Sequence, residues 1–343
     1  MSTICLTNGR QVGDYILPFF VAEINTSHFG KVETAIQIVD EAKKIGVDCV
    51  KFQSWSEESL YSESYFRANP IAKRFIKKFS LNNEELLQIA KHCQRIEIGF
   101  ASTPYSIIEV DFLADECQVP FIKVASMDLN NIPFLKYIAE KQLPVFLSTG
   151  MGTLDEISKA VSTIEKAGNF QIVILHCVSL YPTASADIRL MNIIGLRKLF
   201  PMYPIGFSDH STSIGIPAAS VALGAAVIEK HFTLDRSIIG MDNQMAVESG
   251  EFESMILSCK EANAALGGED RILSNDEFAQ RELMRRSAVA GRKLESGHVL
   301  EISDFDFKRP GTGIAPDSID LLLGRVLLRS VDCDDQIIEN DVG

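Results

Sequence analysis

The chain lacks the features of a membrane or secreted protein. None of its apolar runs approaches the roughly 20 residues needed to span a bilayer. The first residues carry no charged region followed by an apolar run, so no signal peptide is expected. The seven cysteines include no Cys-x-x-Cys pair, which argues against a disulfide framework or a zinc ribbon. Scattered reduced thiols are typical of the cytoplasm, where we expect this protein.

Basic residues are also in short supply. The chain has 33 lysines and arginines against 46 acidic residues, a formal charge of -13. A surface of this sign repels a phosphate backbone, so no nucleic-acid partner is expected, and an anionic substrate needs a local basic site. Two nucleotide-binding signatures are missing too, since no P-loop occurs and no Gly-x-Gly-x-x-Gly follows the first strand-like run.

What the chain does contain is a regular alternation of strand-like apolar runs and helix-like runs. Eight such units follow one another in about 250 residues. Apolar residues make up 46% of the chain, enough for a large core. The pattern predicts the α/β class and a (β/α)8 TIM barrel rather than an open doubly wound sheet, which usually has fewer strands.

The alternation ends at Gly267 and Gly268. A charged stretch from Asn275 to Arg286 is predicted to be a linker helix, and short β-like runs separated by Gly and Asp turns follow it. We therefore expect a barrel over residues 1–268, a linker over 269–286 and a small β-rich domain over 287–343. A domain of that size has little core of its own.

Polar residues recur at the carboxyl ends of the predicted strands, where the active sites of such barrels lie. Two of them, Lys51 and Lys123, are lysines inside apolar runs. A lysine that faces the inside of a barrel has to lose its charge or bind an anion. Two ammonium groups with several nearby hydroxyl groups favour a phosphate or carboxylate site. The alternative is that each lysine points outward, with its stem buried and its head in water.

The last two predicted strands each end in a histidine, His210 and His231. The stretch between them is small, apolar and helix-like. Neighbouring parallel strands would bring both histidines to one rim, where two neutral imidazoles can bind a divalent metal. The alternative is two unrelated histidines, one capping a helix and one packed in the core.

The motifs around these residues resemble those of the N-acetylneuraminate (sialic acid) synthase family, which includes the legionaminic and pseudaminic acid synthases. The resemblance covers nearly the whole chain through these motifs: Ala22-Glu23-Ile24-Asn25, Val50-Lys51-Phe52-Gln53, Ser102-Thr103-Pro104, Ile122-Lys123-Val124-Ala125-Ser126, Leu147-Ser148-Thr149-Gly150-Met151, Tyr181-Pro182-Thr183, Gly206-Phe207-Ser208-Asp209-His210, Glu229-Lys230-His231-Phe232, Leu234-Asp235-Arg236 and Gly240-Met241-Asp242. The segment from Lys308 to Ile314 resembles the loop of the family's C-terminal antifreeze-like (SAF, β-clip) domain. The resemblance implies an enzyme that condenses phosphoenolpyruvate with an N-acetylated sugar to a nine-carbon 2-keto-3-deoxy acid.

The resemblance also implies roles for the site residues. His210 and His231 would hold a divalent ion, expected to be Mn2+, with Mg2+ or Co2+ as alternatives. Phosphoenolpyruvate would be bound by Lys51, Thr103, Lys123, Ser126, Ser148 and Ser208. The acceptor sugar would be surrounded by Glu23, Gln53, Tyr181 and Asp242, with Ser179 as a further substrate-binding residue. Glu23 would be the general acid/base, acting with Lys51 and Lys123; the alternative is that it only forms a salt bridge to Lys51.

The family's members form dimers, so the resemblance implies a domain-swapped homodimer in which Arg309 touches the acceptor in the partner's site. Many members have Asn at the position of Ser179 and Pro at that of Met241. These departures leave the acceptor open between N-acetylmannosamine and a di-N-acetylated trideoxyhexose. The segment from Trp55 to Phe79, expected over the acceptor, also departs from the family's pattern. Two other functions are left open, a metal-dependent class II pyruvate aldolase and a non-catalytic sugar-binding protein.

Overall fold

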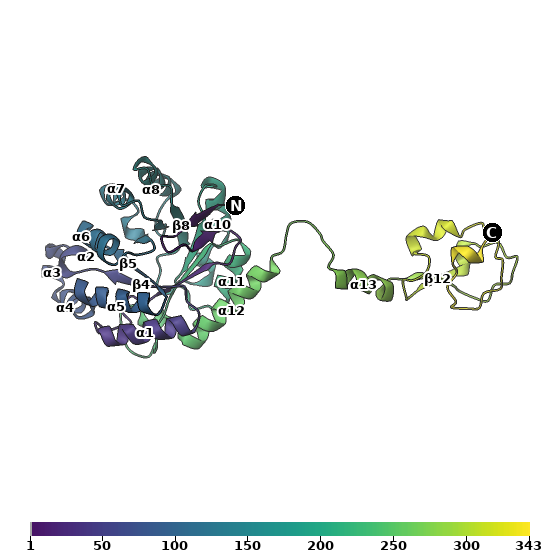
Figure 1. The fold of residues 1–343 in the computed structure, drawn as a ribbon, viewed down its shortest axis with the longest axis horizontal. Helices are drawn as coiled ribbons and strands as arrows, with labels where there is room; N and C mark the ends of the chain where they lie inside the picture. The colour runs from purple at the N-terminus through teal and green to yellow at the C-terminus, as the bar shows by residue number, and fades with distance from the viewer. Residues whose placement is uncertain (1) are drawn as a thin grey trace. The chain divides into compact units, whose positions relative to one another are not determined.

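The structure, a computed structural model, describes residues 2–343 and divides after Gly267 into two compact units. The first unit contains a parallel sheet of eight strands with helices around it (Figure 1). The strand order is β5, β4, β3, β10, β9, β8, β7 and β6, and the two end strands, β5 and β6, also lie side by side. The predicted α/β class and TIM barrel are therefore confirmed.

The barrel strands coincide with the strand-like runs of the sequence. Their bounds are β3 (Phe19–Glu23), β4 (Cys49–Ser54), β5 (Gly99–Pro104), β6 (Ile122–Val124), β7 (Val145–Ser148), β8 (Ile172–Cys177), β9 (Ile205–Asp209) and β10 (Val227–His231). Side chains along each strand alternate between the inside of the barrel and the surrounding helices. The residues at every second position of a strand therefore decide whether the barrel interior is apolar or polar.

The inside of the barrel is apolar toward the amino ends of the strands. Phe121 and Phe146 stack with ring centroids 3.8 Å apart, and Phe19 meets both rings edge-on. A hairpin of β1 (Thr3–Cys5) and β2 (Gln11–Gly13) packs its apolar side chains into the same cluster. Because this end is filled, the polar side chains further along the strands gather at the carboxyl rim, where barrel enzymes bind substrates.

Helices cover the outside of the sheet through apolar stripes. In α8 the buried residues Ile157, Ala160, Val161 and Ile164 follow the spacing of an amphipathic helix. The helices of this unit that pack around the barrel are α1 (Val32–Lys44), α5 (Asn83–Arg95), α6 (Ile107–Asp111), α7 (Ile132–Glu140), α8 (Leu154–Lys166), α9 (Ser185–Ile188), α10 (Met191–Leu199), α11 (Gly215–Ala222) and α12 (Ser249–Ala265). Within residues 2–343, none of the helices combines the length and apolar character that a membrane crossing requires.

Three short helices form the segment between β4 and α5 that we expected over the acceptor. They are α2 (Glu57–Leu60), α3 (Glu63–Ala68) and α4 (Pro70–Phe79). Trp55, Phe66, Ile76 and Phe79 give these helices a small core of their own. Since β4 ends at Ser54, the insertion begins at the carboxyl rim of the barrel.

The second unit, residues 268–343, is small and β-rich. It begins with α13 (Asn275–Met284), and its strands β11 (Ser287–Ala290) and β12 (Phe305–Lys308) pair antiparallel. Leu300 and Leu327 belong to a separate buried core in this unit. The predicted small β-rich domain at the carboxyl end is confirmed.

Candidate active site

Strand register brings polar side chains of neighbouring strands to the same height at the carboxyl rim. Glu23 of β3 is paired with Lys51 of β4 on one side and with His231 of β10 on the other. Glu229 of β10 is paired with Ser208 of β9. Because the interior positions of a strand repeat every two residues, Glu229 and His231 both face the inside.

Both predicted lysines are almost completely buried, each with 4% of its side chain exposed. Lys51 forms an ion pair with Glu23, and its Nζ lies 3.7 Å from Glu229 Oε1. The Nζ of Lys123 lies 3.9 Å from the same oxygen and donates a hydrogen bond to Ser148 Oγ at 2.6 Å. The alternative of lysine heads in water is therefore wrong, and the salt bridge offered as the alternative role of Glu23 is present.

Hydroxyl groups also surround the two ammonium groups. Lys51 Nζ donates to Thr103 Oγ1 at 3.3 Å. Ser208 Oγ donates to Glu229 Oε1 at 3.0 Å. A hydroxyl group can rotate and donate to another acceptor, so these side chains can donate hydrogen bonds to an anion that binds here.

The charged groups shift one another's pKa values in definite directions. Burial by itself lowers the pKa of Lys51, but Glu229 and Glu23 outweigh it and the pKa is raised. For Lys123, burial prevails over Glu229 and the pKa is lowered. Burial raises the pKa of the Glu23 carboxyl, although the Lys51 ammonium group opposes the shift. The site therefore contains two lysines with pKa values pushed apart, a feature common among functional groups.

His210 and His231 meet at the rim, with ring centroids 5.6 Å apart. The Nδ1 of His210 lies 2.7 Å from the carbonyl oxygen of Val178, which leaves Nε2 available to a ligand. Burial lowers the pKa of both histidines, that of His231 well below its ordinary value. Both rings are therefore neutral at pH 7, the form in which imidazole binds metal. The ring of Tyr181 lies 4.3 Å from that of His210.

The residues at this rim fit a divalent metal with two protein ligands. Among residues 2–343, no group of three His, Cys, Asp or Glu side chains could hold an ion. The histidine pair would leave the remaining positions to water or substrate oxygens. In this described part of the chain, Glu229 Oε2 is buried without a hydrogen-bond partner. This oxygen can therefore accept from a donor group or ligate a cation at the rim.

The other predicted substrate-binding residues lie around this centre. Gly150 N donates to Ser126 Oγ at 3.0 Å, and a Cβ at Gly150 would overlap the hydroxyl groups of Ser126 and Ser179. Asp242 contacts the side-chain amide of Asn25. Ser126 and Ser179 therefore converge on one glycine, whereas no hydrogen bond or ion pair among the described residues joins Asp242 to the lysine pair.

Arg309, the last predicted site residue, is exposed and belongs to the second unit, just after β12. The barrel unit does not include it. The geometry of the barrel rim therefore does not test the role predicted for Arg309.

Sequence reasoning missed two residues of the site. It assigned no role to Glu229, which lies between the two lysines. A charged residue two positions before His231 in an apolar strand was the signal that could have identified it. It also missed Tyr105, whose hydroxyl donates to Gln53 Oε1 at 3.0 Å, while Gln53 Nε2 donates to Glu23 Oε1 at 3.2 Å. Its position directly after β5 was the available signal.

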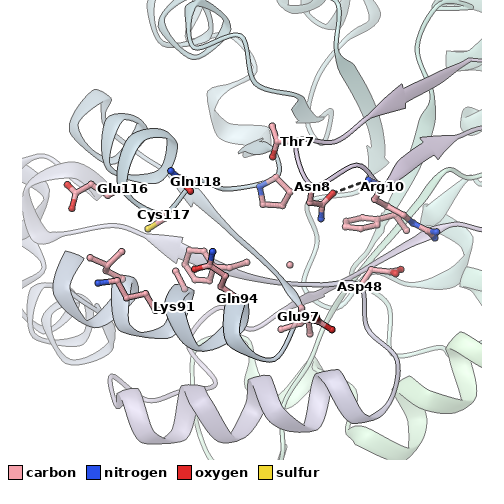
Figure 2. Close-up of a pocket in the computed structure, with 17 residues that line it drawn as sticks. Thr7, Asn8, Arg10, Asp48, Lys91, Gln94, Glu97, Glu116, Cys117 and Gln118 are labelled. Carbon is pink, nitrogen blue, oxygen red and sulfur yellow. Dashed lines mark hydrogen bonds between the residues drawn. The ribbon is translucent and has the colours of Figure 1, made fainter.

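A cavity of about 700 Å3 lies elsewhere, near the amino ends of β4 and β5 (Figure 2). Arg10 and Asp48 lie on one side of it, and Lys91 and Glu116 lie on the other. Because its charged groups do not converge and barrel chemistry belongs to the carboxyl rim, this cavity is not the candidate active site.

The chain is similar in sequence and fold to known proteins. The NeuB family matches residues 38–271, and the SAF domain matches residues 285–342. The N,N'-diacetyllegionaminic acid synthase of Legionella pneumophila is 33% identical over 91% of each chain. The human N-acetylneuraminate-9-phosphate synthase is 34% identical over 97% of this chain and 95% of its own. A crystal structure of an N-acetylneuraminic acid synthetase from Leptospira borgpetersenii, in complex with citrate, matches 81% of this chain and 95% of its own with a TM-score of 0.75 and 32% identity.

Proposed function

Because the chain belongs to the NeuB family and ends in a SAF domain, we propose that it condenses phosphoenolpyruvate with an N-acetylated hexose. The product is a nine-carbon 2-keto-3-deoxy acid of the sialic type. One observation carries the proposal: two buried ammonium groups, those of Lys51 and Lys123, flank Glu229 at the barrel rim that also holds two neutral histidines.

A small phosphorylated acid suits the floor of this site. The ammonium groups of Lys51 and Lys123 are charged donors to its phosphate and carboxylate oxygens, and such bonds are shorter and stronger than neutral ones. The hydroxyl groups of Ser148 and Ser208 lie beside these lysines or their counter-charge. When no phosphoenolpyruvate is bound, Glu229 and Glu23 provide the negative charge that the two buried ammonium groups need.

His210 and His231 are the residues that would hold the divalent ion, for which we propose Mn2+. When bound, such an ion supplies Lewis-acid polarisation of the acceptor's open-chain aldehyde. The chain keeps both imidazoles neutral through burial and orients His210 through the contact between Nδ1 and Val178 O.

Glu23 is the residue to which we assign proton transfer. Its Oε1 accepts hydrogen bonds from Asn25 N at 3.0 Å and from Gln53 Nε2 at 3.2 Å, which fixes the carboxylate. In the proposed reaction, C3 of phosphoenolpyruvate forms a bond to the aldehyde carbon and water adds at C2. Glu23 takes one proton from this water and gives it to the aldehyde oxygen, which becomes a hydroxyl group. The bond between C2 and the phosphate oxygen then breaks, the C2 hydroxyl group loses its proton to the departing phosphate, and C2 becomes the keto carbon.

We place the acceptor sugar beside Gln53, Tyr181 and Asp242. Tyr181 offers an aromatic face next to His210, and Asp242 offers a carboxylate held by Asn25. N-acetylmannosamine and a di-N-acetylated trideoxyhexose are the two acceptors we propose to test. We further propose that the enzyme is a domain-swapped homodimer in which Arg309 contacts the acceptor bound in the partner's barrel.

The test is phosphate release from phosphoenolpyruvate that carries 18O in its C2–O–P bridge. With Mn2+ and the right sugar, we expect release that depends on the sugar, with the label in the phosphate because the C–O bond breaks. Product from free pyruvate would instead identify the aldolase alternative. No turnover with any N-acetylated hexose, despite sugar binding, would identify a non-catalytic binding protein.

A further inference from the structure

A buried ion pair joins β9 and β10 on the side of the strands that faces away from the barrel interior. Lys230 and Asp209 are register partners, and Lys230 Nζ lies 2.5 Å from Asp209 Oδ2. The two side chains are 1% and 0% exposed. Because neighbours in a strand point to opposite faces, Lys230 lies between the inward-facing Glu229 and His231 and does not itself face the substrate.

The same ion pair ties down the backbone that follows His210. Lys230 Nζ also donates to Ser211 O at 2.7 Å. Asp209 Oδ1 accepts from Ser211 N at 2.9 Å, and Oδ2 accepts from Ser211 Oγ at 3.1 Å. Asp209, which precedes His210, is therefore part of the ion pair, and Ser211, which follows His210, is hydrogen-bonded to both of its members.

The remaining groups of this turn are fixed as well. His210 O accepts from Thr183 N at 3.0 Å, and His210 Nδ1 contacts Val178 O at 2.7 Å. Ser211 Oγ accepts from Ser213 N at 3.2 Å, which connects the turn to the start of α11. A catalytic or metal-binding side chain has to be held within about 0.5 Å of its productive position, and this turn has the contacts to do so.

Stability alone gives little reason for such a pair. Burying two charges costs solvation free energy, and the attraction between them often does no more than offset this cost. Replacing a buried ion pair by apolar residues is therefore frequently neutral or stabilising. We propose that Lys230 and Asp209 are positioning residues that hold His210 in register with His231 for the divalent ion. This inference rests on the metal site of the proposed function and adds to it a pair of charges that contacts neither metal nor substrate.

A second ion pair in the same unit provides a matched control. Arg197 Nε lies 3.2 Å from the buried Asp14 Oδ2, and the guanidinium group donates to the carbonyl oxygens of Leu223 and Gly224 at 2.9 Å each. Like Lys230, Arg197 binds one carboxylate and backbone carbonyl oxygens. These carbonyls precede β10, at the amino ends of the strands and away from the histidines.

The experiment measures the affinity of the substrate-free protein for Mn2+ by electron paramagnetic resonance, together with the thermal unfolding midpoint. The variants are Lys230→Met, the charge-free double variant Lys230→Met/Asp209→Asn, Arg197→Met and His231→Ala. Lys230→Met leaves Asp209 buried and unpaired, so we expect it to unfold more easily. The double variant removes that cost and should recover much of the stability.

We expect the double variant to bind Mn2+ about tenfold or more weakly than wild type, the range found when groups that orient metal ligands are removed. Arg197→Met should lose stability and keep wild-type affinity. Wild-type affinity in a folded double variant would overturn the inference. If the double variant does not fold, Asp209→Asn alone replaces it under the same criterion. Failure of the wild type to bind Mn2+, or equal binding by His231→Ala, would overturn the proposed metal site and the inference with it.

Discussion

The hydroxyl group of Tyr105 donates a 3.0 Å hydrogen bond to Oε1 of Gln53. Gln53 in turn donates through Nε2 to Glu23, so the orientation of its amide is set at both ends. The ring of Tyr105 packs against the small core of the α2–α4 insertion. One side chain therefore connects the insertion to the carboxylate that we assign to proton transfer.

Tyr105→Phe should weaken the use of the acceptor sugar and spare that of phosphoenolpyruvate. One hydrogen bond contributes about 0.5–1.5 kcal/mol of free energy. Its loss should therefore raise KM for the sugar about two- to tenfold. Steady-state kinetics with each substrate varied in turn is the measurement. Tyr65→Phe, on the exposed face of α3, is the control. Equal effects on both substrates would contradict the assignment of Tyr105 to the acceptor side.

Removal of the metal, or of either metal ligand, should abolish activity. His210→Ala and His231→Ala each leave one imidazole, and one neutral nitrogen holds a divalent ion weakly. We expect loss of turnover with little change in circular dichroism, and reversible loss when wild type is treated with a chelator. His92→Ala, whose ring contacts Asp40 on the outside of the barrel, is the matched control. Full activity in the chelated enzyme would rule out the metal proposal.

Lys51→Ala and Lys123→Ala should raise KM for phosphoenolpyruvate far more than KM for the sugar. A hydrogen bond to a charged group contributes about 1.5–3 kcal/mol, which corresponds to about one to two orders of magnitude in affinity. Lys141→Ala is the control, because Lys141 pairs with Asp111 and Asp115 at the surface. If both barrel lysines can be removed without an effect on phosphoenolpyruvate, the anion site lies elsewhere.

Binding of phosphoenolpyruvate should weaken on the alkaline side because of Lys123. Burial lowers the pKa of Lys123, so its ammonium group is charged below that pKa and loses its charge as pH rises through it. The affinity should therefore fall at a lower pH than an ordinary lysine would cause. Lys123→Arg, which keeps its charge at all accessible pH values, should move this fall to higher pH. An unchanged alkaline limb in the arginine variant would assign the effect to another group.

The proposed domain swap can be tested by complementation between chains. Arg309→Ala and His231→Ala chains are unfolded together and refolded, and sialic-type product is measured at limiting sugar. If Arg309 acts on the partner's barrel, the mixed dimer has one intact site and part of the wild-type activity returns. Properly formed heterodimers that remain inactive would show that each chain supplies its own arginine, whereas wild-type activity of the Arg309→Ala protein alone would show that Arg309 plays no part.

Much of this protein is determined locally by its sequence. The repeat of strand-like and helix-like runs is enough to predict the barrel, because strands have a period of two and helices a period of 3.6. The polar residues at strand ends predict the rim, since parallel strands in a barrel end on one face. Lys51, Lys123, His210 and His231 could therefore be selected without coordinates.

Only the tertiary structure decided which of these groups meet. Lys51 of β4 contacts Glu23 of β3 and approaches Glu229 of β10, which lies on the other side of β3 in the sheet and far away in the chain. Glu229 then becomes the counter-charge of both lysines, and Lys230 becomes a support for His210. The physical reason is that periodicity fixes the face to which a side chain points, whereas hydrogen bonds and ion pairs depend on strand register and side-chain packing between segments that local sequence does not relate.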